Sequence, residues 1–272
     1  MSESPLTEIR RLADGDDVGS ILPASVGNTM PVPDAGKPGS FRRQQGHFVD
    51  MLVEASQGHV RGAVASVAAQ MMAHGISAEE IADTYIPAAA RRMGDLWCDD
   101  HMGFAGVTVG CSRLQALLRD MGPDWRADNA GAADGPTLLV LVASDICHTL
   151  GATVLAGQLR RRGLSVRLLI GARPEDVGPM LRQIRFDAVL ISASVGESLE
   201  SLRKLVDAVG TATMTPPPVA IGGTILTAPG FDRALVKTMT GADHVTSDPI
   251  EALDLCGVIL SARTNRRRAR KS

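Results

Sequence analysis

Aromatic residues make up only 3% of this 272-residue chain, with a single tyrosine and two tryptophans. Its four cysteines lie far apart and form no C-x-x-C pair, which excludes a disulfide framework and is typical of a reducing cytoplasm. No apolar run reaches the roughly 18 residues of a membrane span, and no charged-then-apolar leader begins the chain. G-x-G-x-x-G and Walker fingerprints are also absent. We therefore expect a cytoplasmic protein with no membrane partner and no nucleotide site of those two kinds.

The first half of the chain predicts a disordered arm followed by a helical domain. Residues 1–40 combine Gly, Pro, Asp and Ser with few large apolar side chains, which favours disorder. Residues 41–122 carry apolar side chains at three- and four-residue steps, which predicts a helical bundle. Within it, Gly75 is suited to end one helix, Ser77 and Glu80 form a capping box that begins the next, and Pro87 predicts a break or kink.

The second half predicts an α/β domain. A linker rich in Gly, Ala, Asp and Pro covers residues 123–136, and a basic tail occupies residues 263–272. Between them, residues 137–262 alternate short apolar runs with helical patterns, which predicts a doubly wound, flavodoxin-like parallel sheet buried on both faces. The predicted strands are 137–143, 165–171, 187–193, 217–223 and 242–246, and the predicted helices are 149–162, 174–184, 198–209, 232–240 and 248–263.

Polar residues and glycines follow three of these strands. The sequence "DICHTLG" places Asp145, Cys147 and His148 after the first strand, with Thr149 and Gly151 opening the next helix. Ser192 and Ser194 follow the third strand, and Gly222, Gly223 and Thr224 follow the fourth. Because doubly wound sheets bind ligands beyond the carboxyl ends of their strands, these segments are candidates for one site.

The three segments resemble the cobalamin-binding domain shared by methionine synthase, corrinoid methyl carriers and adenosylcobalamin mutases. That family carries Asp-x-His-x-x-Gly, Ser-x-Leu and Gly-Gly in this order, where this chain has "DICHTLG", "SAS" and "IGG". The resemblance covers residues 137 to about 260 and implies a cobalamin cofactor, either adenosylcobalamin or hydroxocobalamin. His148 would be the metal ligand that binds cobalt from below, in place of the cofactor's own dimethylbenzimidazole, and a neighbouring carboxylate would orient its ring.

The resemblance also assigns roles to the smaller residues of these segments. Gly151 would let the helix start approach the corrin, and Ser192 or Ser194 would bond the buried base. Gly222 and Gly223 would leave room for the nucleotide tail.

Departures from the family pattern favour a cobalamin that is sensed rather than cycled through methyl transfer. Asp145 lies three residues before His148 where the family has two, and Cys147 directly precedes the histidine. Ser194 replaces the leucine of Ser-x-Leu. The imidazole would then lack the carboxylate relay of the methyl carriers.

The helical region resembles the segment W-x9-E-H of light-sensing cobalamin regulators, in which the tryptophan and the Glu-His pair cover the upper face of the cofactor. Trp97 matches, but Val107 and Thr108 occupy the Glu-His positions. His101, four residues past Trp97 and so one helical turn away, is a candidate substitute.

A helical cap, a degenerate cobalamin domain and no helix-turn-helix domain together resemble the PpaA/AerR antirepressors of photosynthetic bacteria. This resemblance implies a non-enzymatic, light-responsive regulator that binds cobalamin in the crevice between cap and sheet and acts through a partner transcription repressor. The basic tail is a candidate for DNA contact.

Other interpretations stay open. A corrinoid methyl carrier is the enzyme-linked alternative, and heme is the alternative cofactor because Cys147 and His148 suit iron as well. His148 can be a surface histidine, Asp145 an N-cap, Trp97 part of the bundle core and His101 solvated. Inert packing on apolar faces is expected for three cysteines: Cys98, Cys111 and Cys256.

Overall fold

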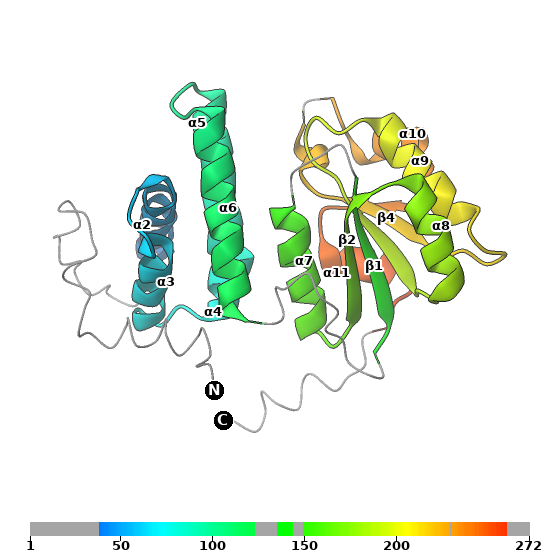
Figure 1. Cartoon of the computed structure of the whole chain (residues 1–272), viewed down its shortest axis with the longest axis horizontal. Helices are drawn as coiled ribbons and strands as arrows, with labels where there is room; N and C mark the ends of the chain where they lie inside the picture. Colours follow the sequence, from blue (N-terminus) through cyan, green and yellow to red (C-terminus); the bar gives the residue numbers. More distant parts are fainter. Residues whose placement is uncertain (1–37, 123–134, 144–148, 229, 260–272) are drawn as a thin grey trace. The chain divides into compact units, whose positions relative to one another are not determined.

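The computed structural model of this chain describes residues 38–122, 135–143, 149–228 and 230–259 (Figure 1). The chain divides into two compact units, Met1–Pro123 and Asp124–Ser272. The first unit is helical, and the second contains a sheet with helices on both faces, which confirms the predicted fold class. None of the described helices combines the length and the apolar character that a bilayer crossing requires.

The helical unit buries one apolar stripe of each of its long helices. Its elements are α2 (Pro38–Gln57), α3 (Ala63–Ala73), α4 (Ala78–Glu80), the π-helical turn η2 (Ile81–Tyr85), α5 (Ile86–Cys98) and α6 (Phe104–Met121). The fully buried side chains include Phe48, Leu52, Met71, Ile86, Met93 and Leu114. Helix α2 begins at Pro38, slightly inside the segment predicted as a disordered arm.

The residues that were predicted to end, begin or interrupt helices in the helical unit have these roles in the structure. Gly75 has a φ of 82° just beyond the end of α3, a left-handed conformation that glycine adopts without a Cβ clash. The Ser77 hydroxyl accepts a hydrogen bond from the Glu80 amide at 3.1 Å. Pro87 lies in the first turn of α5, directly after η2. Since proline has no amide hydrogen, the regular α-helical bonding changes here, and the predicted break takes the form of a π-helical turn.

The α/β unit has a five-stranded sheet in the order β2-β1-β3-β4-β5, and every paired strand runs parallel to its neighbour. Its strands are β1 (Thr137–Ala143), β2 (Ser165–Ala172), β3 (Ala188–Ser192), β4 (Val219–Gly222) and β5 (His244–Val245). The connecting elements are α7 (Leu150–Arg161), α8 (Pro174–Gln183), α9 (Leu199–Gly210), the short 3-10 helix η4 (Thr224–Thr227), α10 (Arg233–Thr240) and α11 (Pro249–Leu255).

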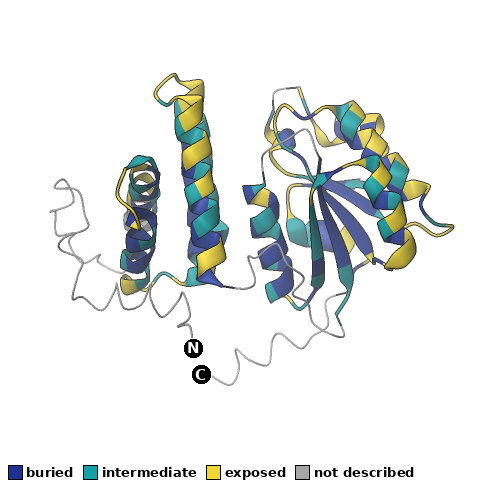
Figure 2. Ribbon diagram, in the orientation of Figure 1, coloured by how far each residue is buried: buried dark blue, intermediate teal, exposed yellow. Residues whose placement is uncertain are grey.

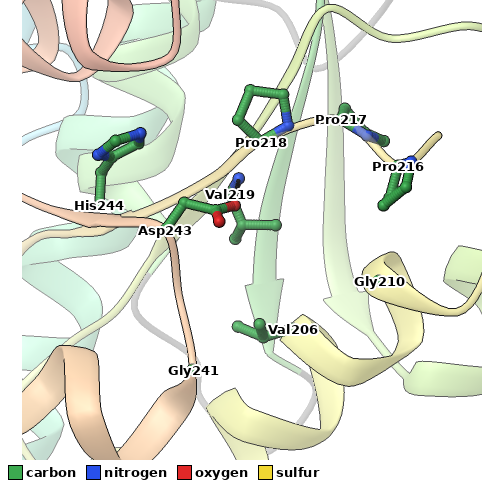
Figure 3. A pocket seen from close by; sticks show the side chains of 9 residues that line it. All are labelled: Val206, Gly210, Pro216, Pro217, Pro218, Val219, Gly241, Asp243 and His244. Atoms are coloured by element: carbon green, nitrogen blue, oxygen red, sulfur yellow. Dashed lines mark hydrogen bonds between the residues drawn. The ribbon is translucent and has the colours of Figure 1, made fainter.

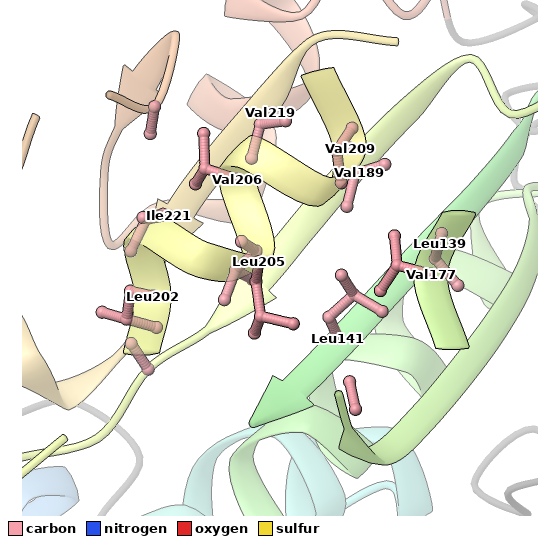
Figure 4. Packing of buried hydrophobic residues seen from close by; sticks show 14 of the residues in the cluster. Leu139, Leu141, Val177, Val189, Leu202, Leu205, Val206, Val209, Val219 and Ile221 are labelled. Atoms are coloured by element: carbon pink, nitrogen blue, oxygen red, sulfur yellow. The ribbon is translucent and has the colours of Figure 1, made fainter. Parts of the chain in front are cut away.

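Alternating side chains of the strands divide the core into two layers. Leu139, Leu141 and Val189 pack with α8, α9 and α10 on one face (Figure 4). Leu138 and Val140 pack on the opposite face with α7 and α11. Strand β1 is buried from Leu138 to Ala143 (Figure 2), as expected for a central parallel strand.

Two details differ from the expectations. Strand β2 is not buried on both faces, because it lies at the edge of the sheet, and Ile170 is 44% exposed. The last helix does not continue to residue 263: α11 ends at Leu255, where Gly257 adopts a φ of 70°. The amides of Gly257 and Val258 then donate to the Asp254 and Leu253 carbonyls, which closes the helix end.

Candidate functional site

The carboxyl end of the sheet brings the serine and glycine segments together. Ser192 of β3 lies opposite Gly222 of β4 in the strand register, and the Ala193 amide donates to the Gly222 carbonyl at 2.7 Å. Ser192 and Ser194 are both half-buried. Their hydroxyls have no hydrogen-bond partner within the described part of the chain. Two polar groups are thus available to a ligand at this edge.

The two glycines are required by the packing of this chain itself. A Cβ on Gly222 would lie 2.4 Å from the Thr246 carbonyl oxygen, and one on Gly223 would lie 2.2 Å from the Ala193 carbonyl oxygen. Gly223 also has a φ of 110°, which side-chain-bearing residues rarely adopt. The positions that the two Cβ atoms would take are occupied by backbone that follows β3 and β5, and the predicted role of both glycines beside a nucleotide tail stays a prediction.

Side chains fix the loop that follows β3. The buried Glu197 accepts a hydrogen bond from the Ser194 amide at 2.8 Å, and the Glu197 amide donates to the Ser194 carbonyl at 3.2 Å. Thr224 Oγ1 accepts from the Val195 amide at 3.3 Å, which ties this loop to η4. Thr224 was predicted to contact the cofactor, and its hydroxyl also binds the backbone of the loop after β3. Glu197 was missed by the sequence analysis, although its spacing of three residues from Ser194 suits a local side chain to backbone bond.

A second polar network lies beyond β5. The buried Thr246 hydroxyl donates to the Glu251 carboxylate, and the Arg233 guanidinium binds both oxygens of that carboxylate at 3.0 and 3.2 Å. These contacts, first the Thr246 hydrogen bond and then Arg233, lower the pKa of the Glu251 carboxyl below its ordinary value. Since the Thr246 carbonyl faces Gly222, the network fixes one wall beside the glycine pair.

Of the segment that resembles Asp-x-His-x-x-Gly, the structure describes the part that opens α7. Thr149 precedes the helix, and its carbonyl accepts bonds from the Thr153 amide and hydroxyl at 3.0 and 2.9 Å. Gly151 is exposed, and no heavy atom of the described residues lies within 4 Å of the position that a Cβ would take. Asp145, Cys147 and His148 lie outside the described residues, so the predicted cobalt ligand and its neighbours stay predictions.

The structure revises two expectations for the helical unit. Trp97 is 47% exposed and lies 6.1 Å from the ring of Phe104, itself 69% exposed, so Trp97 is not part of the bundle core. His101 is not one helical turn beyond Trp97, because α5 ends at Cys98 and Asp100 turns the chain with a φ of 58°. His101 is exposed, as its solvated alternative predicts.

The other residues named for this region differ in exposure. Thr108 is exposed on α6 and Val107 is half-buried. Among the cysteines, Cys98 is exposed, contrary to the packing expectation, because it ends α5. Cys111 and Cys256 are half-buried, and burial raises the pKa of each thiol, that of Cys256 to about 11. No cluster of three metal-binding side chains occurs within the described ranges.

A hollow of about 480 Å³ lies at the amino ends of the strands, on the opposite side of the sheet from their carboxyl ends (Figure 3). Its lining includes the prolines before β4 and the residues around the start of β5, namely Pro216, Pro217, Pro218, Asp243 and His244. The Asp243 carboxylate accepts a bond from the Val219 amide at 2.8 Å, a structural role. Since parallel sheets bind ligands at carboxyl ends, this hollow is not the candidate site.

Comparisons with known proteins show the family to which the α/β unit belongs. Residues 136–252 match the family model described as the B12 binding domain. A relative from Rhodobacter capsulatus, described as an uncharacterized 20.5 kDa protein in the bchF-crtJ intergenic region, is 42% identical over 173 residues, covering 64% of this chain and 88% of the relative. The monomethylamine corrinoid protein of Methanosarcina barkeri aligns with a TM-score of 0.59 at 16% identity, over 78% of this chain and 97% of its own. That likeness shows the fold.

Proposed function

We propose a cobalamin-dependent regulatory function for this chain, which belongs to the B12 binding domain family. The observation that carries the proposal is the family match over residues 136–252, which spans the whole carboxyl edge from β1 to the loop after β5. Two features of this edge fit a corrinoid. The Ser192 hydroxyl is half-buried without a partner in the described part of the chain, and the space beside Gly151 is open.

Each residue of the proposed site has a distinct task. His148 would bind the cobalt, and Asp145 or a backbone group would accept the other ring N–H. The Ser192 and Ser194 hydroxyls bond polar atoms of the buried nucleotide tail. Glu197 and Thr224 hold the loop that carries Ser194, since they bond the Ser194 and Val195 amides. A bound corrinoid would supply a cobalt ion with light-sensitive ligand chemistry.

The regulatory part of the proposal is supported by the relative that lies in a photosynthesis gene region. Its identity of 42% extends over 173 residues, more than the α/β unit alone contains. Proteins with such similarity share a fold and commonly a cofactor. We infer that this chain is an antirepressor that senses cobalamin and light and acts on a transcription repressor.

Corrinoid binding is tested with the purified full-length protein. It is incubated in darkness with hydroxocobalamin or adenosylcobalamin, desalted and examined by absorption spectroscopy. We expect the wild type to retain a corrinoid and His148→Ala to lose it or to show a changed spectrum. His59→Ala, which alters an exposed histidine of the helical unit, serves as the matched control and retains the wild-type spectrum. A wild type that retains no corrinoid contradicts the proposal, and a heme spectrum supports the alternative cofactor.

A corrinoid methyl carrier is the second candidate, favoured by the fold shared with the monomethylamine corrinoid protein. To distinguish a methyl carrier from a regulator, the bound cofactor is reduced, a methyl donor is added, and methyl transfer to the cofactor is measured. A regulator is expected to show light-dependent binding to a partner, and the products of the bchF and crtJ genes named for the relative are the first to test. Methyl transfer without any light-dependent partner binding contradicts the regulatory proposal.

A further inference from the structure

The Ser192 side chain and the Cβ position of Gly222 face the same side of the sheet, toward α7 and α11. Side chains alternate along a strand, so each position faces the same side as the residue two places before it. Those residues, Leu190 and Ala220, belong to the core layer that α7 and α11 cover. Ile221, between Ala220 and Gly222, instead packs in the layer of α8, α9 and α10 (Figure 4). A ligand that bonds the Ser192 hydroxyl would therefore lie on the α11 side of Gly222.

Thr246 forms the neighbouring wall on this side. It directly follows β5, its amide donates to the Ile221 carbonyl at 3.0 Å, and its carbonyl oxygen lies where it would clash with a Cβ on Gly222. Thr246 is buried, and its hydroxyl accepts a bond from the Asp248 amide at 3.1 Å and donates to the Glu251 carboxylate of α11. The position of the backbone beside Gly222 thus depends on where Glu251 holds this hydroxyl.

Arg233 fixes the carboxylate of Glu251 from the other side of the sheet. Arg233 belongs to α10 and Glu251 to α11, which cover opposite faces, so this ion pair passes the end of the edge strand β5. The guanidinium binds both carboxylate oxygens, at 3.0 and 3.2 Å. The two side chains are 55% and 41% exposed, and ion pairs so exposed contribute little to stability. The clearest consequence of the pair is geometric, because contact with both oxygens fixes the orientation of the carboxylate that holds Thr246.

We propose that Arg233 and Glu251 are positioning residues of the cofactor site, and that they set its preference for corrinoids with a nucleotide tail over corrinoids without one. The proposal rests on the cobalamin-binding function proposed above, in which Ser192 bonds the tail. The contacts run in series from Arg233 to Glu251, Thr246, Gly222 and Ser192, which lies opposite Gly222 in the strand register. The corrin ring is assigned to other segments, around the start of α7. Loss of the network is therefore expected to weaken binding of the tail and to leave binding of the ring unchanged.

The test compares two corrinoids on the full-length protein. One is hydroxocobalamin, and the other is hydroxocobinamide, which keeps the corrin ring and the cobalt but has no nucleotide tail. Dissociation constants are measured in darkness by spectral titration for the wild type and for Glu251→Ala, in which the Thr246 hydroxyl loses its acceptor. Since the change displaces about one hydrogen bond to the tail, we expect about 3- to 10-fold weaker binding of hydroxocobalamin and unchanged binding of hydroxocobinamide.

Three variants serve as checks. Glu251→Gln keeps an acceptor for the Thr246 hydroxyl and is expected to recover part of the lost affinity. Arg233→Gln alters only the outer end of the network and is expected to shift the affinity for hydroxocobalamin less, in the same direction, so it tests the proposal even if Glu251→Ala does not fold. The matched control is Glu200→Gln. Like Glu251, Glu200 lies in the first turn of its helix and forms an ion pair, with Lys204 at 2.8 Å, but α9 covers the opposite side of the sheet, so both affinities should stay unchanged.

The outcomes separate this inference from the proposed cofactor function. Equal weakening for both corrinoids in a folded Glu251→Ala protein, checked by circular dichroism melting, gives the network a general structural role and overturns the inference. An unchanged ratio of the two affinities overturns it as well. A wild type that binds the two corrinoids equally well contradicts the inference alone, since corrinoid binding is then present without a preference for the tail. A wild type that binds neither contradicts the proposed function and the inference together.

Discussion

Replacing Gly151 with alanine tests whether this glycine is needed for ligand binding or for folding. Gly151 is an exposed residue in the first turn of α7, and a Cβ there meets no heavy atom of the described part of the chain within 4 Å. Alanine is preferred over glycine in a helix by about 0.5–1 kcal/mol. The ligand-free variant should therefore be as stable as the wild type or slightly more stable, with a melting temperature up to about 4 °C higher.

Corrinoid affinity is expected to change in the opposite direction. In the resemblance to Asp-x-His-x-x-Gly, Gly151 is where the helix start approaches the corrin, so an added methyl group would intrude on a close contact. Overpacking of that kind costs about 1–3 kcal/mol, which corresponds to roughly 5- to 150-fold weaker binding. Spectral titration with hydroxocobalamin, beside thermal melting of the ligand-free protein, measures both effects.

Gly223→Ala is the contrasting variant. Its Cβ would lie 2.2 Å from the Ala193 carbonyl oxygen at a φ of 110°, so the ligand-free protein itself should be destabilised. The two glycine variants thus differ in the sign of their effect on stability. Unchanged corrinoid affinity in a well-folded Gly151→Ala protein would refute the assignment of Gly151 to the cofactor contact.

Two further predictions concern the networks around the carboxyl edge. Glu197→Ala removes the acceptor of the Ser194 amide and should lower the free energy of unfolding by about 1–3 kcal/mol, whereas Glu197→Gln keeps an acceptor oxygen and should recover most of the loss in urea titrations. Glu251 has a lowered pKa, so its contribution to stability is present above its ordinary value of 4.5 and is lost as the pH falls through the lower folded-state value. Arg233→Gln removes one cause of that shift and should flatten the decline of the melting temperature with falling pH. An equally steep decline in the variant contradicts this account.

Most of the α/β unit could be predicted because its elements are marked by local signals. The first strand has the predicted bounds, since its apolar run ends where polar residues begin. The predicted length of the last helix was wrong because its apolar pattern continues past Gly257, whereas the backbone conformation at that glycine ends the helix. The exposure of β2 could not be predicted, since the order of strands in a sheet is set by long-range packing.

The candidate site was only partly predictable, for a related reason. Ser192 and Gly222 could be assigned to one edge because both follow parallel strands, and the structure places them side by side. Glu197 could not be singled out, because its burial depends on how the loop after β3 folds back. The exposure of Trp97 could not be predicted either, since a tryptophan on a helix suits both a bundle core and a surface that covers a ligand.

The glycine pair shows why a motif match is weaker evidence for a ligand than it first appears. In this chain a Cβ at either position would clash with the Thr246 or Ala193 carbonyl oxygen, whether or not a cofactor binds. The packing of this chain therefore accounts for Gly222 and Gly223 without a ligand. Gly151 and the Ser192 hydroxyl are different, because neither the packing nor the hydrogen bonds of the described chain account for them. A ligand that fills the open space and bonds the hydroxyl would account for both, so these two positions carry more information about binding than the more conspicuous glycine pair.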